Sequence, residues 1–523
     1  MSSEEGWRPA HNPWLIALTV TIATFMEVLD TSIANVSLPH IAGNLSAGVD
    51  ESTWVLTSYL VANAIILPLS GWLSSVFGRK RYYMMSVVLF TVSSFLCGFA
   101  PSLSWLVVFR VIQGLGGGGL QPSEQAILAD TFPASQLGMG MAVYGFAVVT
   151  APIIGPTLGG WITDNFSWRW IFFINVPVGF LSIFLTSKMV EDPPTLKRRN
   201  VKGLNIDVIG LGAIAIGLAS LQIMLDKGQR EDWFESHFII TLGLVAVMAL
   251  IFAFVWEMRV KDPIVDVRLL GERNFFLSNV LMFLLGVVLF GSTVLLPLFL
   301  QTLMGYPATT AGLVLSPGGI VTMLSMPLVG FLLSKYEARW LIAWGLLVVG
   351  TSLVMMSRFN LNISYQTAVS ARIVQAAGLG FLFVPINAVA YSFVKPEKRT
   401  EASGLINLAR NVGAGIGIAI TTTFLARNSQ IHQSVLSSHM TSSNPAYTLA
   451  IAHATQNLLT QGVSATRAAA LAPGLLYGEL LRQSSMLAYL DDFRAMALTC
   501  FLSIGLVFFL KRASPHKGSI PVH

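Results

Sequence analysis

Charged side chains are scarce in this sequence. Only 11% of its 523 residues are Asp, Glu, Lys or Arg, whereas soluble domains carry roughly 25%. Hydrophobic residues make up 54%, so the composition excludes a protein whose surface faces only water. The net charge of +6 does not indicate a nucleic-acid-binding protein, because the basic residues lie in short loops between apolar runs.

Cysteine and reactive motifs are also nearly missing. The two cysteines, Cys97 and Cys500, lie far apart in apolar runs, so we expect packed thiols without a disulfide or a metal site. The sequence contains no P-loop, metal-ligand cluster or Ser-His-Asp arrangement, and the glycine-rich GLGGGGL around Gly116 does not follow a strand. We therefore predict no cofactor and no enzyme activity, and an ATP-driven pump is disfavoured.

Long apolar runs, in contrast, recur along the whole chain, and each can cross a hydrocarbon core of roughly 30 Å. The first, from Trp14, is too long for a signal peptide, so we expect it to be a retained span. Backbone groups in lipid are satisfied only in helices or closed barrels, and the runs do not alternate as barrel strands do. The sequence thus predicts an all-α integral membrane protein with fourteen transmembrane helices, near 14–36, 53–73, 82–100, 104–129, 138–162, 170–189, 205–225, 238–258, 275–301, 309–333, 339–357, 366–393, 401–426 and 495–512.

The distribution of Lys and Arg predicts the orientation of these helices. With a cytoplasmic N-terminus, the cytoplasmic segments contain 21 of the 32 Lys and Arg residues and the outer segments contain eight. Cytoplasmic loops of membrane proteins are enriched in these residues. We therefore expect both termini to be cytoplasmic.

A short internal repeat predicts how the helices are grouped. RVIQGLG begins at Arg110 and RIVQAAGLG at Arg372, and a proline follows each, at Pro122 and Pro385. Similar segments in corresponding spans are typical of duplicated transporter halves. We expect an N-terminal six-helix bundle (1–190), a linker with two inserted transmembrane helices (191–272) and a C-terminal six-helix bundle (273–523) that includes a long periplasmic loop (427–494).

Three segments resemble motifs of the major facilitator superfamily. GWLSSVFGRKR, from Gly71, resembles the loop between spans 2 and 3 of that superfamily, and FRVIQGLGGG, from Phe109, resembles its span 4 motif. APIIGPTLGG, from Ala151, is similar to the span 5 motif of its drug:proton antiporters. The resemblance implies the major facilitator fold for this chain.

Further segments resemble one branch of this superfamily. VLDTSIANVSLP, from Val28, and WRWIFFINVPVG, from Trp168, resemble signatures of the 14-span drug antiporters. LQIMLDKG from Leu221, DWF at Asp232 and DPIVDVRLL from Asp262 are similar to segments of EmrB-type multidrug exporters. The resemblance therefore covers nearly the whole chain.

This resemblance implies a proton-driven multidrug efflux antiporter that works by alternating access in the bacterial cytoplasmic (inner) membrane. Its substrates are then hydrophobic or amphiphilic toxic compounds, and its partners a periplasmic membrane-fusion adaptor and an outer-membrane channel. A proton-coupled metabolite symporter and a stand-alone exporter of the same fold remain alternatives, and a membrane enzyme or receptor is a more distant one.

Two acids, Glu27 and Asp30, lie inside the first apolar run, where a carboxylate costs several kcal/mol. They are three residues apart and so share a helix face. At about 1.5 Å per residue, Asp30 and Arg110 both lie roughly 10 Å below the outer ends of their spans. The arginine can offset the burial of the acid, either as a static ion pair or as part of a site that exchanges a proton.

The resemblance implies the second interpretation, because first-span acids of this family serve proton coupling and substrate binding. We therefore predict a coupling site with Asp30 first, Glu27 second and Arg110 as partner. Glu124, in the inner third of the fourth run, is either a second proton site or a hydrated residue near the cytoplasm.

Polar and aromatic residues in several spans are candidates for the wall of a substrate cavity. Lone amides in spans also form interhelical hydrogen bonds, and aromatic residues at helical spacing also face lipid, so both interpretations stay open for this set. The candidates are Phe25, Asn35, Gln113, Tyr144, Gln375, Asn387, Asn407 and Arg410.

Glycines, prolines and a basic loop form a candidate gating motif. The glycines permit close helix approach and the prolines bend a span, although both also serve plain packing, and the basic loop also suits a cytoplasmic anchor. The superfamily often has Asp at the position of Ser75, so its usual inner ion pair lacks an acid here. The candidates are Gly71, Gly78, Arg79, Pro152, Gly155, Pro156, Gly159 and Gly160.

The long outer segment 427–494 begins as a polar, Ser-rich stretch. We expect a helix from Asn444 to Leu459 and an amphipathic helix from Pro473 onward. The segment is either a cap over its own spans, a helix on the membrane surface, or a docking surface for a periplasmic partner.

Overall fold

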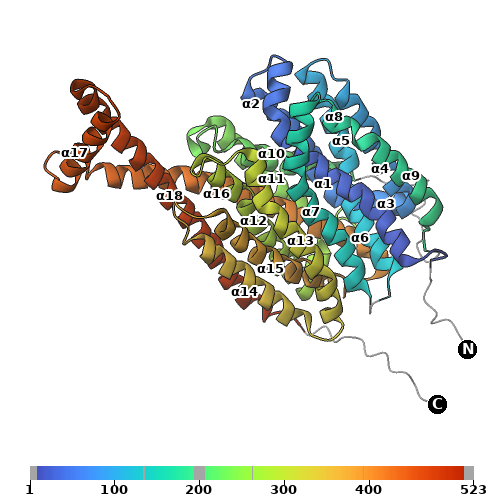
Figure 1. The fold of residues 1–523 in the computed structure, drawn as a ribbon. Helices are drawn as coiled ribbons and strands as arrows, with labels where there is room; N and C mark the ends of the chain where they lie inside the picture. The colour runs from blue at the N-terminus through green and yellow to red at the C-terminus, as the bar shows by residue number, and fades with distance from the viewer. Residues whose placement is uncertain (1–8, 134–135, 194–206, 262, 393, 512–523) are drawn as a thin grey trace, which may run out of the picture.

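The computed structural model describes residues 9–133, 136–193, 207–261, 263–392 and 394–511. Every regular element in these ranges is a helix, and most helices run side by side in one bundle (Figure 1). This confirms the predicted all-α fold.

The predicted first half opens with a helix whose start is encoded locally. The Asn12 side chain accepts a hydrogen bond of 2.9 Å from the Trp14 N–H, and Pro13 occupies the first turn, a combination that favours helix starts. The helices of this half are α1 (Pro13–Asn44), α2 (Val49–Ser52), α3 (Trp54–Phe77), α4 (Arg79–Gly98), α5 (Leu103–Gly117), α6 (Leu120–Thr131), α7 (Leu137–Asn165), α8 (Trp170–Phe173) and α9 (Asn175–Met189).

The rest of the chain contains the predicted insert and the predicted second half. The insert comprises α10 (Val208–Lys227), η1 (Trp233–Glu235), α11 (His237–Arg259) and η2 (Val267–Gly271). The second half comprises α12 (Arg273–Thr302), α13 (Ala308–Leu333), α14 (Ala338–Met356), α15 (Tyr365–Ser392), η3 (Pro396–Lys398), α16 (Arg399–Ser437), α17 (Pro445–Thr460) and α18 (Ala465–Val507). The boundaries of the three domains stay predictions.

The helices that can cross a membrane are fewer than the fourteen predicted. Eleven helices in the described ranges are long and apolar enough, or twelve if the bent α7 counts as one span. Both α4 and α18 fall outside this criterion, although α4 packs against α5 and α18 against α14 within the bundle.

The start of α1 and the end of α18 lie at the same end of the bundle (Figure 1). We name it the inner end, after the predicted orientation, and the opposite end the outer end.

The predicted span 104–129 is broken into α5 and α6 by four consecutive glycines. A Cβ at Gly116 would lie 2.7 Å from the Phe90 nitrogen of α4, and one at Gly118 would lie 2.7 Å from the Asn63 oxygen of α3. Because these backbones touch, no larger side chain fits. The glycines therefore bring the span 4 backbone against α3 and α4.

The two halves contact each other through matching helix pairs. In one pair α7 packs on α13, and in the other α16 packs on α3. The contacts are close: a Cβ at Gly330 of α13 would lie 3.1 Å from the Gly138 carbonyl carbon of α7, and one at Gly71 of α3 would lie 2.5 Å from the Glu401 Cα of α16. Gly71, from the gating motif, thus lies directly in the interface between the halves.

Helix α7 is bent by 43° where Pro152 meets Ile154. Pro156 has no N–H, so it leaves the Pro152 carbonyl without its helical partner, and Ser32 of α1 donates to that carbonyl at 3.2 Å. A Cβ at Gly155 would lie 2.3 Å from the Ser32 Oγ, whereas one at Gly160 would meet nothing within 4 Å. Pro152, Gly155 and Pro156 therefore form a bend that α1 supports, while Gly160 is not needed for packing.

An ion-pair network closes the inner end. Arg79, at the start of α4, pairs with Asp130 of α6 and donates to the Thr400 hydroxyl of α16 at 3.1 Å. Arg399 of α16 also pairs with Asp130, at 3.0 Å. Ser75 instead donates to the carbonyl of its own helix, at Trp72. The acid expected in this family at position 75 is thus replaced, in this network, by Asp130 from another helix.

Gly78 lets this network form. Its φ of 88° lies in the left-handed region that glycine tolerates, and this turn directs α4 back from the end of α3. Arg79 follows immediately and is buried. Gly78 and Arg79 therefore act together at the inner end.

The segment 427–494 contains the helix expected from Asn444 to Leu459, as α17 (Pro445–Thr460), but its other parts differ from the prediction. α16 continues as helix to Ser437, and α18 begins at Ala465, so that Pro473 lies inside a helix instead of starting one. The C-terminal part of α16 and the N-terminal part of α18 extend beyond the bundle, with α17 at the tip (Figure 1). We name residues 428–478 the arm. It projects away from the spans (Figure 1), which contradicts the cap interpretation, whereas α18 packs against the spans from Leu480 onward.

We predict that Asp130→Asn loosens the inner end. The variant removes the anion shared by Arg79 and Arg399, and loss of one partner of a buried pair is strongly destabilising, by about 3–5 kcal/mol for fully buried pairs. Distances between spin labels at Phe77 and Lys395, measured by pulsed electron resonance, should shift to longer values. Asp164→Asn, the same change at an exposed outer position, serves as control. An unchanged distance distribution in Asp130→Asn would show that this network does not hold the inner end closed.

Candidate functional site

A buried ion pair lies at the centre of the first half. Arg110 of α5 donates to Asp30 of α1 at 2.5 Å, and both side chains are fully buried. Asp30 also accepts hydrogen bonds from Gln113 at 3.1 Å and from Asn175 of α9 at 2.7 Å. Arg110 donates in addition to the Val55 carbonyl of α3 at 3.0 Å. The contact expected from the matched depths of Asp30 and Arg110 is therefore present, and four helices converge on it.

Aromatic rings complete the surroundings of Arg110. Its guanidinium carbon lies 4.3 Å from the ring centroid of Tyr59 and 5.6 Å from that of Phe172. Cations are attracted to the faces of such rings, more strongly when water is excluded. Arg110 is thus held by one carboxylate, one backbone carbonyl and two rings.

Glu27 lies one helical turn from Asp30 and has different partners. It accepts hydrogen bonds from the Tyr59 hydroxyl at 3.0 Å, the Asn63 amide at 3.2 Å and the Gln121 amide at 2.6 Å. All three donors are neutral, and among the described residues no cation forms an ion pair with Glu27. A buried carboxylate without a counter-ion is costly in free energy. Arg110 offsets this cost for Asp30, whereas for Glu27 a bound proton would remove it.

Gln121 links Glu27 to the second half of the protein. Its amide nitrogen donates to Glu27, and its amide oxygen accepts from Arg410 of α16 and from the Tyr144 hydroxyl of α7, the latter at 3.0 Å. Arg410 also donates to Tyr144 at 3.1 Å. An acid of the first half and a cation of the second half are therefore bridged by a single amide.

Below this bridge a second group of polar side chains joins the two halves. Gln125 of α6 accepts hydrogen bonds from Tyr391 of α15 and Ser403 of α16, both at 2.6 Å, and from Asn407 at 3.0 Å. The Asn407 oxygen in turn accepts from Tyr144 at 3.2 Å. The candidates Tyr144, Asn407 and Arg410 thus meet at one place, packed against each other.

Glu124 lies on α6, on the helical turn that follows Gln121, and is fully buried. The Thr21 hydroxyl of α1 donates to one of its oxygens at 2.6 Å. Its other oxygen and the Thr24 hydroxyl have no hydrogen-bond partner in the described part of the chain. This burial contradicts the alternative in which Glu124 is hydrated near the cytoplasm.

The second half contains a copy of the Arg110 site that lacks the acid. Arg372 of α15 donates to Gln375, and Gln375 donates to the Ser292 hydroxyl of α12 at 2.9 Å. In the first half, Gln113 donates in the same way to Asp30. Arg372 is 1% exposed, and none of the described residues forms an ion pair with it. The repeat expected from the sequence therefore extends to the side-chain contacts, except that Ser292 stands where the first half has Asp30.

The remaining candidates lie outside these clusters. Asn387 is buried and donates to the Phe383 carbonyl one turn back in its own helix. Phe25 is half-buried, and Asn35 is exposed on α1. Cys97 and Cys500 are free, buried thiols. Within the described ranges, no group of three or more His, Cys, Asp or Glu side chains could hold a metal ion.

Several residues of the site were not recognised in the sequence. Gln121, Gln125, Asn63, Tyr391 and Ser403 are ordinary polar residues in apolar runs, and nothing in their local sequence marks them. Asn175 lies inside the segment WRWIFFINVPVG that carries the resemblance, so the motif contained a signal for it. The others become visible only when the helices are packed.

Comparison with known proteins identifies the class. Residues 20–418 match the Major Facilitator Superfamily. The fold is similar to the human organic anion transporter MFSD10, with a TM-score of 0.61, 11% identity and coverage of 95% of this chain and 100% of that one. It is also similar to the proton:xylose symporter XylE, with a TM-score of 0.58, 16% identity and coverage of 93% and 94%. The chain belongs to the Major Facilitator Superfamily and is a membrane transporter.

Curated relatives place the chain within this family. It is 36% identical over 507 residues to the multidrug export protein EmrB of Escherichia coli, covering 96% of this chain and 97% of that protein. It is 34% identical over 496 residues to the fatty acid resistance protein FarB of Neisseria gonorrhoeae, covering 95% and 96%. The chain groups with the EmrB-type proteins, and it is a multi-pass protein of the inner membrane.

We predict that Ser292→Asp stabilises the protein, because it supplies Arg372 with the acid that Arg110 already has. Removal of one partner from a buried pair costs about 3–5 kcal/mol, so adding a partner should recover part of that amount. The apparent Tm in detergent should rise by several degrees. Ser292→Asn, similar in size but uncharged, should not raise it. Equal Tm values for the two variants would mean that Arg372 gains nothing from a carboxylate here.

Proposed function

We propose that this transporter exports hydrophobic or amphiphilic toxic compounds in exchange for protons. The substrate class rests on the relatives, whose names describe multidrug export, fatty acid resistance and, for the Acinetobacter baumannii EmrB (30% identical over 511 residues), colistin resistance. The proton coupling rests on the bridge from Glu27 through Gln121 to Arg410.

The bridge offers a way for a proton to change the contact between the halves. While Glu27 is charged, it attracts the Gln121 nitrogen, which directs the Gln121 oxygen toward Arg410. A proton on Glu27 removes the charge-assisted part of this hydrogen bond, which is roughly twice as strong as a neutral one. The amide is then free to turn, and its hold on Arg410 weakens.

The direction of this effect suits an antiporter. In this structure the inner end is closed by Asp130 with Arg79 and Arg399. A proton that reaches Glu27 from the outer side would weaken a link between the halves and favour opening at the inner end. Release of the proton to the inside would restore the link, so proton entry would drive the cycle that carries a compound outward.

Asp30 and Glu27 have distinct parts in this proposal. Asp30 holds Arg110 through their ion pair and shapes the site. Glu27 has only neutral partners in this state and takes the proton first. Glu124, on the turn of α6 that follows Gln121, is the next acid on the route inward.

A partner in the periplasm is the second part of the proposal. The arm projects from the outer end of the bundle (Figure 1) and carries large apolar side chains at exposed positions. Exposed apolar surface commonly marks an interaction site, and here it comes from α16, α17 and α18. We infer that the arm binds a membrane-fusion adaptor that leads to an outer-membrane channel. These side chains are Ile431, Val435, Leu449, Leu471, Leu475 and Tyr477.

Glu27→Gln and Asp30→Asn test the coupling. We expect Glu27→Gln to fold normally, to bind an exported dye and to exchange dye for dye across proteoliposomes. Transport driven by an imposed pH gradient should fall at least tenfold, because no proton can be released at this site. Asp30→Asn should also lose gradient-driven transport, but with a lower Tm, since Arg110 keeps no counter-ion.

Glu51→Gln, at an exposed outer position, is the control and should transport normally. Full gradient-driven efflux by both site variants would show that the proton is carried elsewhere, with Glu124 next. A gradient-driven increase of dye inside intact, drug-sensitive cells would instead indicate a symporter.

The arm is tested by a double variant, Leu471→Ser with Leu475→Ser. Co-purification with a co-expressed membrane-fusion adaptor should drop several-fold, because two exposed apolar contacts are lost, while dye binding by the transporter alone stays unchanged. Ala469→Ser with Ala470→Ser, two exposed positions on the same helix, is the matched control. If the leucine variant retains its adaptor as well as the control does, this face of α18 is not the docking surface.

A further inference from the structure

The inserted helices are tied to both halves of the transporter at the outer end. Toward the first half, Thr57 of α3 hydrogen-bonds Asp226, and Lys227 donates to the Thr53 hydroxyl at 2.8 Å. Toward the second half, the Trp233 indole donates to the Thr423 hydroxyl of α16 at 2.7 Å. The turn after α10 therefore spans from α3 to α16.

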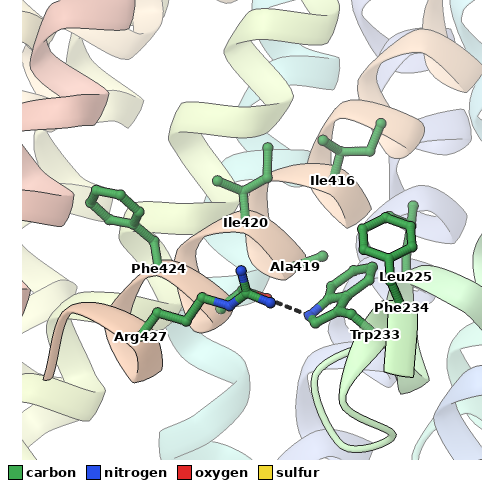
Figure 2. Close-up of a pocket in the computed structure, with 9 residues that line it drawn as sticks. Leu225, Trp233, Phe234, Ile416, Ala419, Ile420, Phe424 and Arg427 are labelled. Atoms are coloured by element: carbon green, nitrogen blue, oxygen red, sulfur yellow. Dashed lines mark hydrogen bonds between the residues drawn. The ribbon is translucent and has the colours of Figure 1, made fainter. Parts of the chain in front are cut away.

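A pocket of about 380 Å³ lies between this turn and α16. Figure 2 shows Trp233 and Phe234 on one side and successive turns of α16 on the other, with Arg427 at one edge. Its lining is apolar except for Thr423 and Arg427, and it contains no acid. The lining residues are Leu225, Trp233, Phe234, Ile416, Ala419, Ile420, Thr423, Phe424 and Arg427.

Trp233 is held in an unusual conformation to form this wall. Asp232 and Trp233 have φ values of 51° and 50°, in a left-handed region that is unfavourable for bulky residues and in which they are rare. The ring packs directly on Gly228, where a Cβ would lie 2.5 Å from it. Such strain persists where the surrounding structure fixes it, and clusters at ligand sites.

The depth of the pocket in the membrane fits a lipid. At about 1.5 Å per residue, Ile416 lies roughly 25 Å and Arg427 roughly 42 Å from Arg399 at the inner end of α16. A bilayer has a hydrocarbon core of about 30 Å and is about 40–45 Å thick with its headgroups. The apolar wall thus lies at the depth of outer-leaflet acyl chains, and Arg427 at the depth of their phosphates.

The charged residues beside the pocket indicate which lipid headgroup fits it. Arg427 is exposed, and among the described residues no acid forms an ion pair with it. On the facing turn, the exposed acids Glu231, Asp232 and Glu235 lie beside Trp233 and Phe234 and outnumber the one exposed base there, Arg230. A cation on one side and acids on the other suit a headgroup that carries both a phosphate and a primary ammonium. A purely anionic headgroup would meet the acids unfavourably.

We propose that this pocket binds one outer-leaflet phosphatidylethanolamine molecule. Its phosphate contacts Arg427, its ammonium group faces the acids of residues 231–235, and an acyl chain lies along Ile416, Ile420 and Phe424. Because the turn is tied to α3 and the pocket wall belongs to α16, the lipid connects the insert to both halves. This site is independent of the acids in the first half and of the exported compound.

Native mass spectrometry of the purified full-length protein tests this site. After equal addition of phosphatidylethanolamine, phosphatidylglycerol or phosphatidylcholine, the protein should retain one phosphatidylethanolamine in clear preference to the other two. Arg427→Gln should weaken this retention roughly tenfold, since hydrogen bonds to charged groups contribute about 1.5–3 kcal/mol. Ile420→Trp, which fills the pocket from an exposed position, should abolish it.

Arg467→Gln is the matched control, because Arg467 is an exposed arginine of the arm. It should retain the lipid like the unmodified protein, and the Tm of all variants is recorded to show that they are folded. Equal retention by Arg427→Gln and Arg467→Gln would overturn the proposal, as would a preference for phosphatidylglycerol. Displacement of the lipid by an exported dye would also overturn it, because the pocket would then be a substrate site.

Discussion

A charge buried among apolar helices must have a partner, and this constraint organises the first half of the transporter. Asp30 and Arg110 neutralise each other at 2.5 Å, away from water. The pair also hydrogen-bonds Gln113 of α5, Asn175 of α9 and the Val55 carbonyl of α3. The pair is costly to bury and costly to break. Four helices are therefore fixed relative to one another around a single site.

Glu27 differs from Asp30 because its hydrogen-bond partners are neutral. A buried acid without an ion-pair partner among the described residues thus lies next to the Asp30–Arg110 pair. Gln121 hydrogen-bonds both Glu27 and Arg410, across the boundary between the halves. At the inner end, Asp130 holds an arginine from each half. A transporter that alternates between two arrangements needs contacts between its halves that are strong in one state and breakable, and hydrogen-bonded polar groups at a glycine-lined interface meet both needs.

The two halves have matching helices and a matching Arg–Gln contact, but they differ in the charged residues around it. Arg110 and Arg372 begin matching segments and each contacts a glutamine three residues on, yet only the first half supplies an acid. Among the described residues, the buried acid that faces the repeated arginine is therefore present in the first half alone. The insert adds a link at the outer end, where the strained Trp233 meets α16, and the arm extends the second half away from the membrane (Figure 1).

Patterns within single segments determined much of this protein. Apolar runs predicted the helices, the repeat at Arg110 and Arg372 predicted matching sites, and the matched depths of Asp30 and Arg110 predicted their contact, because helix rise and lipid thickness are fixed distances.

Only the tertiary structure decided the rest. Gln121 and Asp130 look ordinary in the sequence, since their partners Glu27, Arg410 and Arg399 lie up to hundreds of residues away. The start of the segment 427–494 was predicted wrongly because its polar, Ser-rich residues suit a loop, whereas α16 continues there as a helix that contacts α18 through His432 and Asp491 at 2.8 Å. Local sequence specifies helices and their burial, but contacts between distant helices depend on packing that no single segment encodes.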